Sequence, residues 1–217
     1  RLVSLRYWNA FHVERASQSF GGKMLCCSGP LSGYRRSILT DELLQDFTKQ
    51  RFGGSICRAG DDRHLTNQLL ERGWETKVCL SARCETFVPE SLRSYLKQQV
   101  RWNRSFYREA LWTMKHVRRL NLFSAYSLGM QILLPMLLTV SLSVVAIELS
   151  HGNIVPLVHY AGTLTLMGVL HSLYGLIRTR RVGFLLFPAY GVLHVCLLIP
   201  SRAWSLVTMG GMNWGTR

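Results

Sequence analysis

The chain of 217 residues is long enough for one large or two small domains, and 26 Lys and Arg against 12 Asp and Glu give a formal net charge of +14. This excess favours an anionic partner: nucleic acid, acidic lipid or a phosphorylated substrate. The charge is uneven, because residues 121–217 contain only five basic residues and one acidic residue. The distribution therefore indicates a soluble part joined to a membrane part and argues against a nucleic-acid-binding protein.

Residues 1–90 show the alternation of helices and strands that is typical of an α/β domain. Apolar runs rich in Val, Thr and Phe predict the strands, and Gly and Asp mark helix ends. The predicted helices are residues 1–20, 41–50 and 63–72, and the predicted strands are residues 24–27, 75–82 and 84–88. Turn-rich or Gly-rich loops are expected at residues 28–33 and 51–60.

A long amphipathic helix is predicted next, from about residue 91 into the basic run at 115–119. Gln98, Arg101 and Trp102 are spaced i, i+3, i+4 and therefore share one face of it. An amide, a guanidinium and an indole on one face suit a polar, ring-shaped ligand with negative charge, because Arg neutralises phosphate and Trp stacks on a sugar. The alternative is a helix whose Trp packs in the core and whose Arg is solvated.

Two runs without Lys, Arg, Asp or Glu follow, at residues 121–147 and 153–177. Each exceeds the roughly 20 residues that cross a bilayer, and basic residues before the first and after the second predict cytoplasmic ends. A third run, residues 182–201, contains Pro188, Gly191 and Pro200. We expect it to enter the membrane without crossing; a third crossing is the alternative.

These patterns divide the chain into four parts. The predicted boundaries are a cytoplasmic domain at 1–90, an interfacial helix at 91–120, a membrane region at 121–208 and a cytoplasmic tail at 209–217. The six cysteines include no Cys-x-x-Cys pair, and no His lies at zinc spacing. No metal ligands are therefore predicted in this chain.

Asp61 and Asp62 follow Gly60 at a predicted junction between a loop and a helix. A carboxylate in such a place can act as a general base and take a proton from an attacking hydroxyl. The alternative is an ordinary N-cap with a charged neighbour.

Four stretches occur in the order found in the processive, membrane-embedded family 2 glycosyltransferases, which include cellulose, chitin and hyaluronan synthases. They are Ser28-Gly29-Pro30, Gly60-Asp61-Asp62-Arg63, the Gln-x-x-Arg-Trp pattern at 98–102, and Trp214-Gly215-Thr216-Arg217. The chain resembles this family in almost its whole length. The resemblance implies the later part of a GT-A-like glycosyltransferase domain, of α/β class, followed by an α-helical transmembrane region.

The resemblance also implies roles for individual residues. Asp62 would be the catalytic base, and Asp61 would hold structure or orient a neighbour. Arg101 would neutralise the leaving diphosphate, with Arg217 as a second candidate, while Trp102 would stack on the acceptor sugar and Gln98 would hydrogen-bond it. Further substrate contacts would come from neighbouring motif residues: Arg63, Trp214, Ser28 and Gly29, the last of which allows close backbone approach.

The donor-binding half of such an enzyme, with its Asp-x-Asp metal motif, is expected N-terminal to Arg1. The ligands of a divalent cation (Mg²⁺ or Mn²⁺) and of the uridine would therefore lie outside this chain.

The ending Trp214-Gly215-Thr216-Arg217 and the Gly-Asp-Asp-Arg motif are most similar to hyaluronan synthases of the bacterial and algal-virus type. Such an enzyme in the plasma membrane would use UDP-N-acetylglucosamine and UDP-glucuronic acid in the cytoplasm and export the growing polysaccharide through the lipid bilayer. A chitin- or chitooligosaccharide-type synthase that uses UDP-N-acetylglucosamine only is the first alternative. A basic membrane-bound binding protein without activity is the second, and it would leave the four motifs unexplained.

Overall fold

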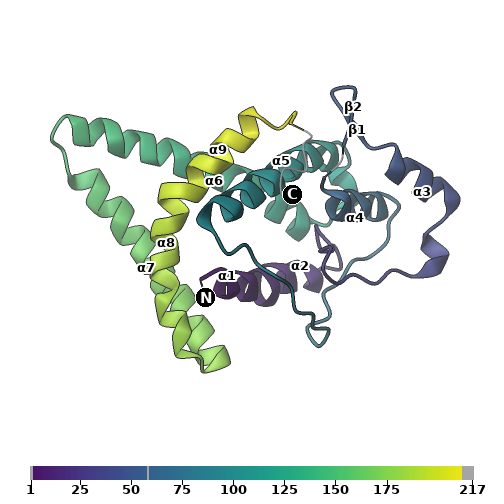
Figure 1. Ribbon diagram of the computed structural model, residues 1–217, viewed down its shortest axis with the longest axis horizontal. Coiled ribbons are helices and arrows are strands. Elements are labelled where there is room, and N and C mark those ends of the chain that lie inside the picture. The colour runs from purple at the N-terminus through teal and green to yellow at the C-terminus, as the bar shows by residue number, and fades with distance from the viewer. Residues whose placement is uncertain (1, 58, 212–217) are drawn as a thin grey trace.

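The computed structural model describes residues 2–57 and 59–211. Figure 1 shows a compact mixed part built from α1 to α5, from which α6 and α7 extend as a long V; α8 and α9 lead back from α7 to α5. One apolar core joins α4, α5 and α6 through Leu70, Phe106 and Leu128. A second joins α5 to the α8–α9 run through Tyr95, Tyr190 and Leu198.

The predicted helix at 1–20 is confirmed as one continuous helical run. It consists of α1 (Leu2–Asn9), the π-helical segment η1 (Ala10–Arg15) and α2 (Ala16–Phe20). Gly22 ends it with a positive φ of 69°, a backbone conformation that glycine adopts without steric cost. The π-helical segment was not predicted.

The three predicted strands are wrong. Residues 24–27 and 75–82 meet only in an isolated parallel bridge between Lys23 and Thr76, and residues 84–88 form no strand. The reason lies in where the backbone hydrogen bonds go. The N–H of Leu25 donates to the Gln18 side chain at 3.2 Å and that of Cys27 to Thr66 Oγ1 at 2.8 Å, so side chains replace a neighbouring strand.

The only sheet in the described residues is a short hairpin within the stretch expected to be a loop. The antiparallel strands β1 (Arg51–Phe52) and β2 (Ser55–Ile56) flank Gly53 and Gly54. Both glycines have positive φ, as a tight two-residue turn requires. A short 3-10 turn, η2 (Arg36–Ile38), and α3 (Asp41–Thr48), capped by Thr40, precede the hairpin, and α4 (Asp61–Glu71) follows it.

The predicted amphipathic helix is confirmed as α5 (Leu92–Lys115), followed by η3 (Val117–Arg119). The Ser91 side chain caps it by accepting a hydrogen bond from the N–H of Ser94 at 3.1 Å. α5 packs along α9 and against α4, so it connects the N-terminal mixed part to the apolar helices.

Three helical runs in the described residues are long and apolar enough to cross a membrane by length and composition. They are α6 (Leu122–Ser150), α7 (Val155–Thr179) and the run Val182–Val207. The third consists of η4 (Val182–Leu186), α8 (Phe187–Leu193), η5 (His194–Leu198) and α9 (Ile199–Val207). The structure therefore confirms the two predicted apolar helices and adds a third candidate, and whether the third crosses stays a prediction.

Small residues on α7 allow the run that follows to pack closely against it. A Cβ at Gly175 would lie 2.2 Å from the Phe184 ring, and one at Gly168 would lie 3.1 Å from the Pro188 backbone. Between them, Ser172 donates to the Phe184 carbonyl at 2.7 Å. Helices that pack in a membrane use such small residues because no hydrophobic effect holds them together there.

Candidate active site

The start of α4 is fixed against α5 at a single glycine. Gly60 has φ of 96°, and a Cβ built there would lie only 1.7 Å from Ser105 Oγ. Ser105 is on α5, one turn beyond Arg101 and Trp102. The backbone of the Gly-Asp-Asp-Arg junction therefore packs directly against the Ser105 side chain of the Gln-x-x-Arg-Trp helix, and a side chain at position 60 would not fit.

Asp62 lies beside the Ser28-Gly29 loop. Its Oδ1 accepts from the N–H of Arg63 at 2.8 Å, and its Oδ2 accepts a long hydrogen bond of 3.4 Å from the N–H of Gly29. Cys26 Sγ is 3.8 Å from the same oxygen. Asp62 is half-buried whereas Asp61 is exposed. The structure thus brings two of the predicted motifs together. Asp62 Oδ2, whose hydrogen bond from Gly29 is long, is the carboxylate oxygen suited to accept a proton from a substrate.

Thr66, which the sequence reasoning missed, clamps this loop onto α4. It is fully buried, accepts from the N–H of Cys27 at 2.8 Å and donates to the carbonyl of Asp62 at 2.7 Å. Because Thr66 lies one turn after Asp62, a hydroxyl that can bond the carbonyl four residues earlier was the available signal.

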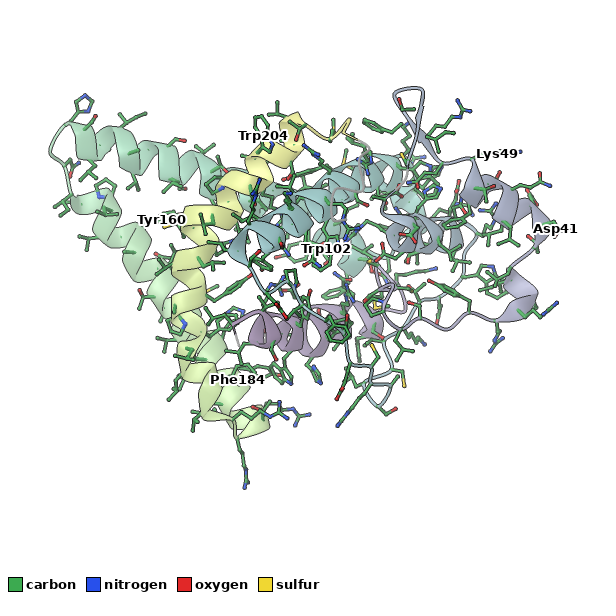
Figure 2. The ribbon with its side chains drawn as sticks, viewed as in Figure 1. Asp41, Lys49, Trp102, Tyr160, Phe184 and Trp204 are labelled. Carbon is green, nitrogen blue, oxygen red and sulfur yellow. The ribbon has the colours of Figure 1, made fainter. Side chains whose placement is uncertain are left out.

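Gln98, Arg101 and Trp102 lie on α5 as predicted, but with different exposure. Trp102 is 41% exposed, and its ring centroid is 6.4 Å from that of Tyr7 on α1; Figure 2 labels it at the centre of the molecule. Gln98 Oε1 is buried and has no hydrogen-bond partner among the described residues. Arg101 is half-buried. An exposed indole beside a second ring and an unpaired amide oxygen suit a sugar ligand, and the substrate roles stay predictions.

Arg63 is held by protein groups. Its Nη1 donates to the carbonyl of Leu25 at 3.5 Å, and its guanidinium carbon lies 5.1 Å from the centroid of the Phe106 ring. These contacts fasten α4 to the core. The substrate contact predicted for Arg63 stays a prediction.

Trp214 and Arg217 lie outside the described residues, but two arginines of α5 position the chain just before them. Arg104 Nε donates to Thr208 Oγ1 at 3.0 Å. Arg108 Nη1 donates to the carbonyl of Met209 at 2.7 Å, and its Nη2 donates to the carbonyl of Ala59 at 3.2 Å. Arg108 is buried and so connects residues 209–211 to the residue that precedes Gly60. Its i, i+4 spacing from Arg104 was visible in the sequence, but its partners were not.

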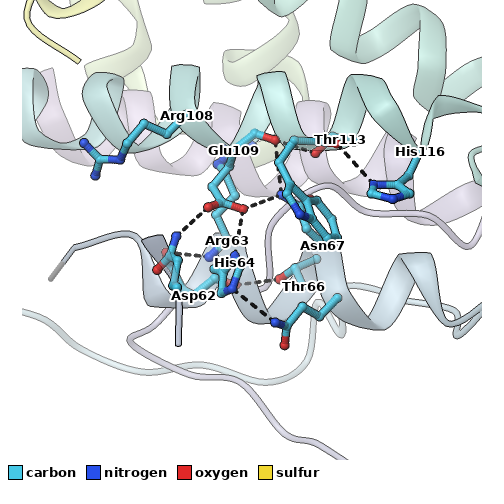
Figure 3. A network of polar contacts seen from close by, with 12 residues as sticks. Asp62, Arg63, His64, Thr66, Asn67, Arg108, Glu109, Thr113 and His116 are labelled. Atoms are coloured by element: carbon cyan, nitrogen blue, oxygen red, sulfur yellow. Dashed lines mark hydrogen bonds and ion pairs between the residues drawn. The ribbon is translucent and has the colours of Figure 1, made fainter. Parts of the chain in front are cut away.

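A buried carboxylate joins α4 to α5 behind the site (Figure 3). Glu109 is 3% exposed; its Oε2 lies 3.2 Å from His64 Nδ1 and accepts from Asn67 Nδ2 at 2.8 Å. Its Oε1 accepts from Gln50 Nε2 at 2.5 Å. Burying a charge is costly without such partners. The network therefore fixes the angle between the helix that carries Asp62 and the helix that carries Trp102.

Burial also sets the ionisation of groups around the Ser28-Gly29 loop. It raises the pKa of the Cys26 and Cys27 thiols, which are therefore neutral at physiological pH. Burial raises the pKa of Tyr34 to about 12, again keeping it neutral. In the same place burial lowers the pKa of Arg15, which remains a cation. The charged groups near the loop are thus Asp62 and nearby arginines.

No group of three or more His, Cys, Asp or Glu side chains that could hold a metal ion occurs among the described residues.

Comparison with known proteins decides the family. A model described as glycosyltransferase-like family 2 matches residues 3–105. The hyaluronan synthase of Streptococcus pyogenes is 36% identical over all 217 residues of this chain, which correspond to 51% of that protein. The chain belongs to glycosyltransferase family 2. The predicted resemblance to hyaluronan synthases is thereby confirmed.

Related family 2 enzymes from animals give the same result. Hyaluronan synthase 3 of Homo sapiens is 35% identical over 220 aligned residues, covering 99% of the chain and 38% of the human protein. The mouse protein of the same name matches equally, at 35% identity. The chain spans about half the length of the bacterial relatives it matches. Its fold class is as predicted: part of a glycosyltransferase family 2 domain followed by long apolar helices.

Proposed function

We propose that this chain is part of a membrane-embedded, processive and inverting glycosyltransferase that makes hyaluronan from UDP-N-acetylglucosamine and UDP-glucuronic acid and exports it. Similarity to bacterial and mammalian hyaluronan synthases over the whole chain supports this product. The observation that carries the proposal is the convergence of motifs at the start of α4. Asp62 contacts Gly29, while Gly60 packs against Ser105 of the helix that carries Arg101 and Trp102.

In this proposal Asp62 takes the proton of the acceptor hydroxyl as that oxygen attacks the anomeric carbon of the donor. Arg101 stabilises the negative charge that develops on the departing diphosphate. Trp102 stacks on the acceptor sugar, and Gln98 hydrogen-bonds it. Family 2 enzymes generally use a divalent cation, which helps to neutralise a leaving diphosphate. We place the ligands of this cation in the donor-binding part of the enzyme, as the family resemblance implies.

The proposed orientation places the catalytic part and residues 208–211 on the cytoplasmic side. Three hydrogen bonds support this. The first turn of α6 is held by the soluble part: Asn121 Nδ2 donates to the Gly21 carbonyl at 2.6 Å, and Ser124 Oγ donates to that of Lys23 at 2.9 Å. The end of α9 is held by α5, as Ser205 Oγ donates to the Val100 carbonyl at 3.3 Å.

The start of α6 and the end of α9 therefore lie against the same part of the protein, the one built from α1 to α5. This arrangement favours a run at 182–207 that enters the membrane and returns, with the Trp214-Gly215-Thr216-Arg217 tail close to the active site. A plasma membrane location follows from the proposed export of polymer.

The product is tested with membranes that contain the full-length protein, given each labelled donor alone and then both. Polymer from the two donors together but from neither alone supports hyaluronan synthesis. Polymer from UDP-N-acetylglucosamine alone refutes it in favour of the chitin-type alternative. If correctly folded protein makes no polymer under any condition, the remaining hypothesis is a membrane-bound binding protein without activity.

The orientation is tested with one cysteine at Gly210, which is exposed, in a background without the native cysteines. A membrane-impermeant thiol reagent should label it only after the cells are opened. Labelling in intact cells would contradict the cytoplasmic tail and the role assigned to Arg217.

A further inference from the structure

Arg15 reaches the Ser28-Gly29 loop from the first helical run, although no motif includes it. It is the last residue of the π-helical segment η1. Its Nη1 donates to Ser28 Oγ. Single π-helical turns are rare and occur frequently at functional sites. Here the Arg15 side chain contacts the loop whose Gly29 N–H donates to Asp62.

The guanidinium of Arg15 lies over an aromatic ring and has more N–H donors than its one acceptor in the described part of the protein uses. Its central carbon lies 4.3 Å from the centroid of the Phe11 ring, a contact that orients the flat group. An Arg side chain has five N–H donors, and Ser28 is the one hydrogen-bond acceptor for it among the described residues. The remaining donors are available to a ligand.

Arg15 forms no ion pair within the described part of the chain. Arg6, nine residues earlier in the same run, shows the usual arrangement, with its Nη1 2.8 Å from Glu14 Oε1. Burial lowers the pKa of Arg6, but Glu14 and nearby tyrosines outweigh that effect and raise it. For Arg15, burial prevails and the pKa is lowered, although Asp62 and Glu14 favour its charged form. A largely buried cation without a paired carboxylate is unfavourable unless an anion arrives.

We propose that Arg15 binds an oxyanion of the sugar substrate at the Ser28-Gly29 loop. This rests on the proposed function and names a further binding residue for the same site. Two groups of the substrates have the required chemistry: the carboxylate of glucuronic acid, at the end of the acceptor or on the donor, and the diphosphate of either donor. Both can take two parallel N–H bonds from one guanidinium, which Lys cannot supply.

The test uses purified full-length enzyme with Arg15→Gln, Arg15→Lys and, as a matched control, Arg6→Gln. Dissociation constants are measured for UDP, UDP-N-acetylglucosamine and UDP-glucuronic acid, together with the KM of acceptors that end in either sugar. Loss of a charge-assisted hydrogen bond should weaken the affected ligand about tenfold or more. We expect Arg15→Lys, which keeps the charge, to lose less than Arg15→Gln, and Arg6→Gln to stay within about twofold of wild type.

The pattern of loss identifies the anion. Weaker binding of UDP itself identifies the diphosphate. Unchanged UDP with weaker UDP-glucuronic acid, or with a raised KM for glucuronic-acid-ended acceptors, identifies the carboxylate. Unchanged binding of every ligand in correctly folded Arg15→Gln and Arg15→Lys would overturn the proposal and leave Arg15 as a support for Ser28. If wild type makes polymer from one donor alone, the proposed function fails, while the UDP measurement still tests Arg15.

Discussion

Replacing Gly60 by Ala should disable the enzyme by moving Asp62 relative to α5. Two separate penalties arise. An Ala with φ of 96° is strained, by about 1–2 kcal/mol. Its Cβ would also lie 1.7 Å from Ser105 Oγ and 2.7 Å from Ser105 Cβ, and relieving such overpacking costs about 1–3 kcal/mol. The sum is roughly 2–5 kcal/mol, to be relieved by displacing the start of α4.

Another glycine, next to the same helix, supplies a matched control for the strain of a positive φ alone. Gly73, at the other end of α4, has φ of 85°, but a Cβ there would meet nothing within 4 Å. Gly73→Ala therefore introduces the strain without the collision. We expect it to lower thermal stability slightly while the rate of synthesis stays within about threefold, since its strain is about 1–2 kcal/mol and lies far along the helix from Asp62.

The assay is the initial rate of polymer formation in membranes, normalised to folded enzyme by size-exclusion chromatography. A displacement of about 1 Å at a catalytic group reduces rate about 100-fold, and we expect that loss for Gly60→Ala. The double variant Gly60→Ala with Ser105→Gly should recover part of it, because the nearest remaining Ser105 atom is the Cα at 3.7 Å. A Gly60→Ala enzyme as active as Gly73→Ala would refute the reasoning.

Three further predictions concern single residues. Asp62→Asn should reduce synthesis about 100-fold or more, the usual effect of losing a general base, with donor dissociation constants unchanged; more than a tenth of wild-type turnover would contradict the role. Trp102→Ala should shorten the polymer, whereas Arg101→Ala should weaken UDP binding, and equal UDP affinity in both would show that the roles are not divided. The pKa of Cys79 is lowered by its hydrogen bond to Ser81, whereas burial raises that of Cys26. Because the thiolate is the reactive form, Cys79 should be alkylated first and at lower pH, as peptide mass spectrometry after timed iodoacetamide treatment will measure.

The sequence by itself determined the local elements and the motifs. The spacing of apolar residues and the Ser91 cap specify α5, because helix periodicity and capping involve only neighbouring residues. The length of the uncharged runs specifies α6 and α7 in the same way. The order of the four motifs identified the family, which the comparisons then confirmed.

Only the tertiary structure decided how these pieces meet. Residues 24–27 have the composition of a strand, yet the N–H groups of Leu25 and Cys27 donate to the side chains of Gln18 and Thr66 from two different helices. Strand propensity could not reveal this, since a strand forms only where a neighbouring strand accepts its hydrogen bonds.

The site depends on the same kind of long-range contact. The close approach of Gly60 to Ser105 and the contacts of Glu109 with His64 and Asn67 join residues 42 to 45 positions apart. Arg15, at the end of a π-helical segment, hydrogen-bonds Ser28 thirteen residues further along the chain. Residue spacing along the chain encodes which side chains share a helix face, whereas these contacts are set by how helices pack, and packing is fixed only when the whole core forms.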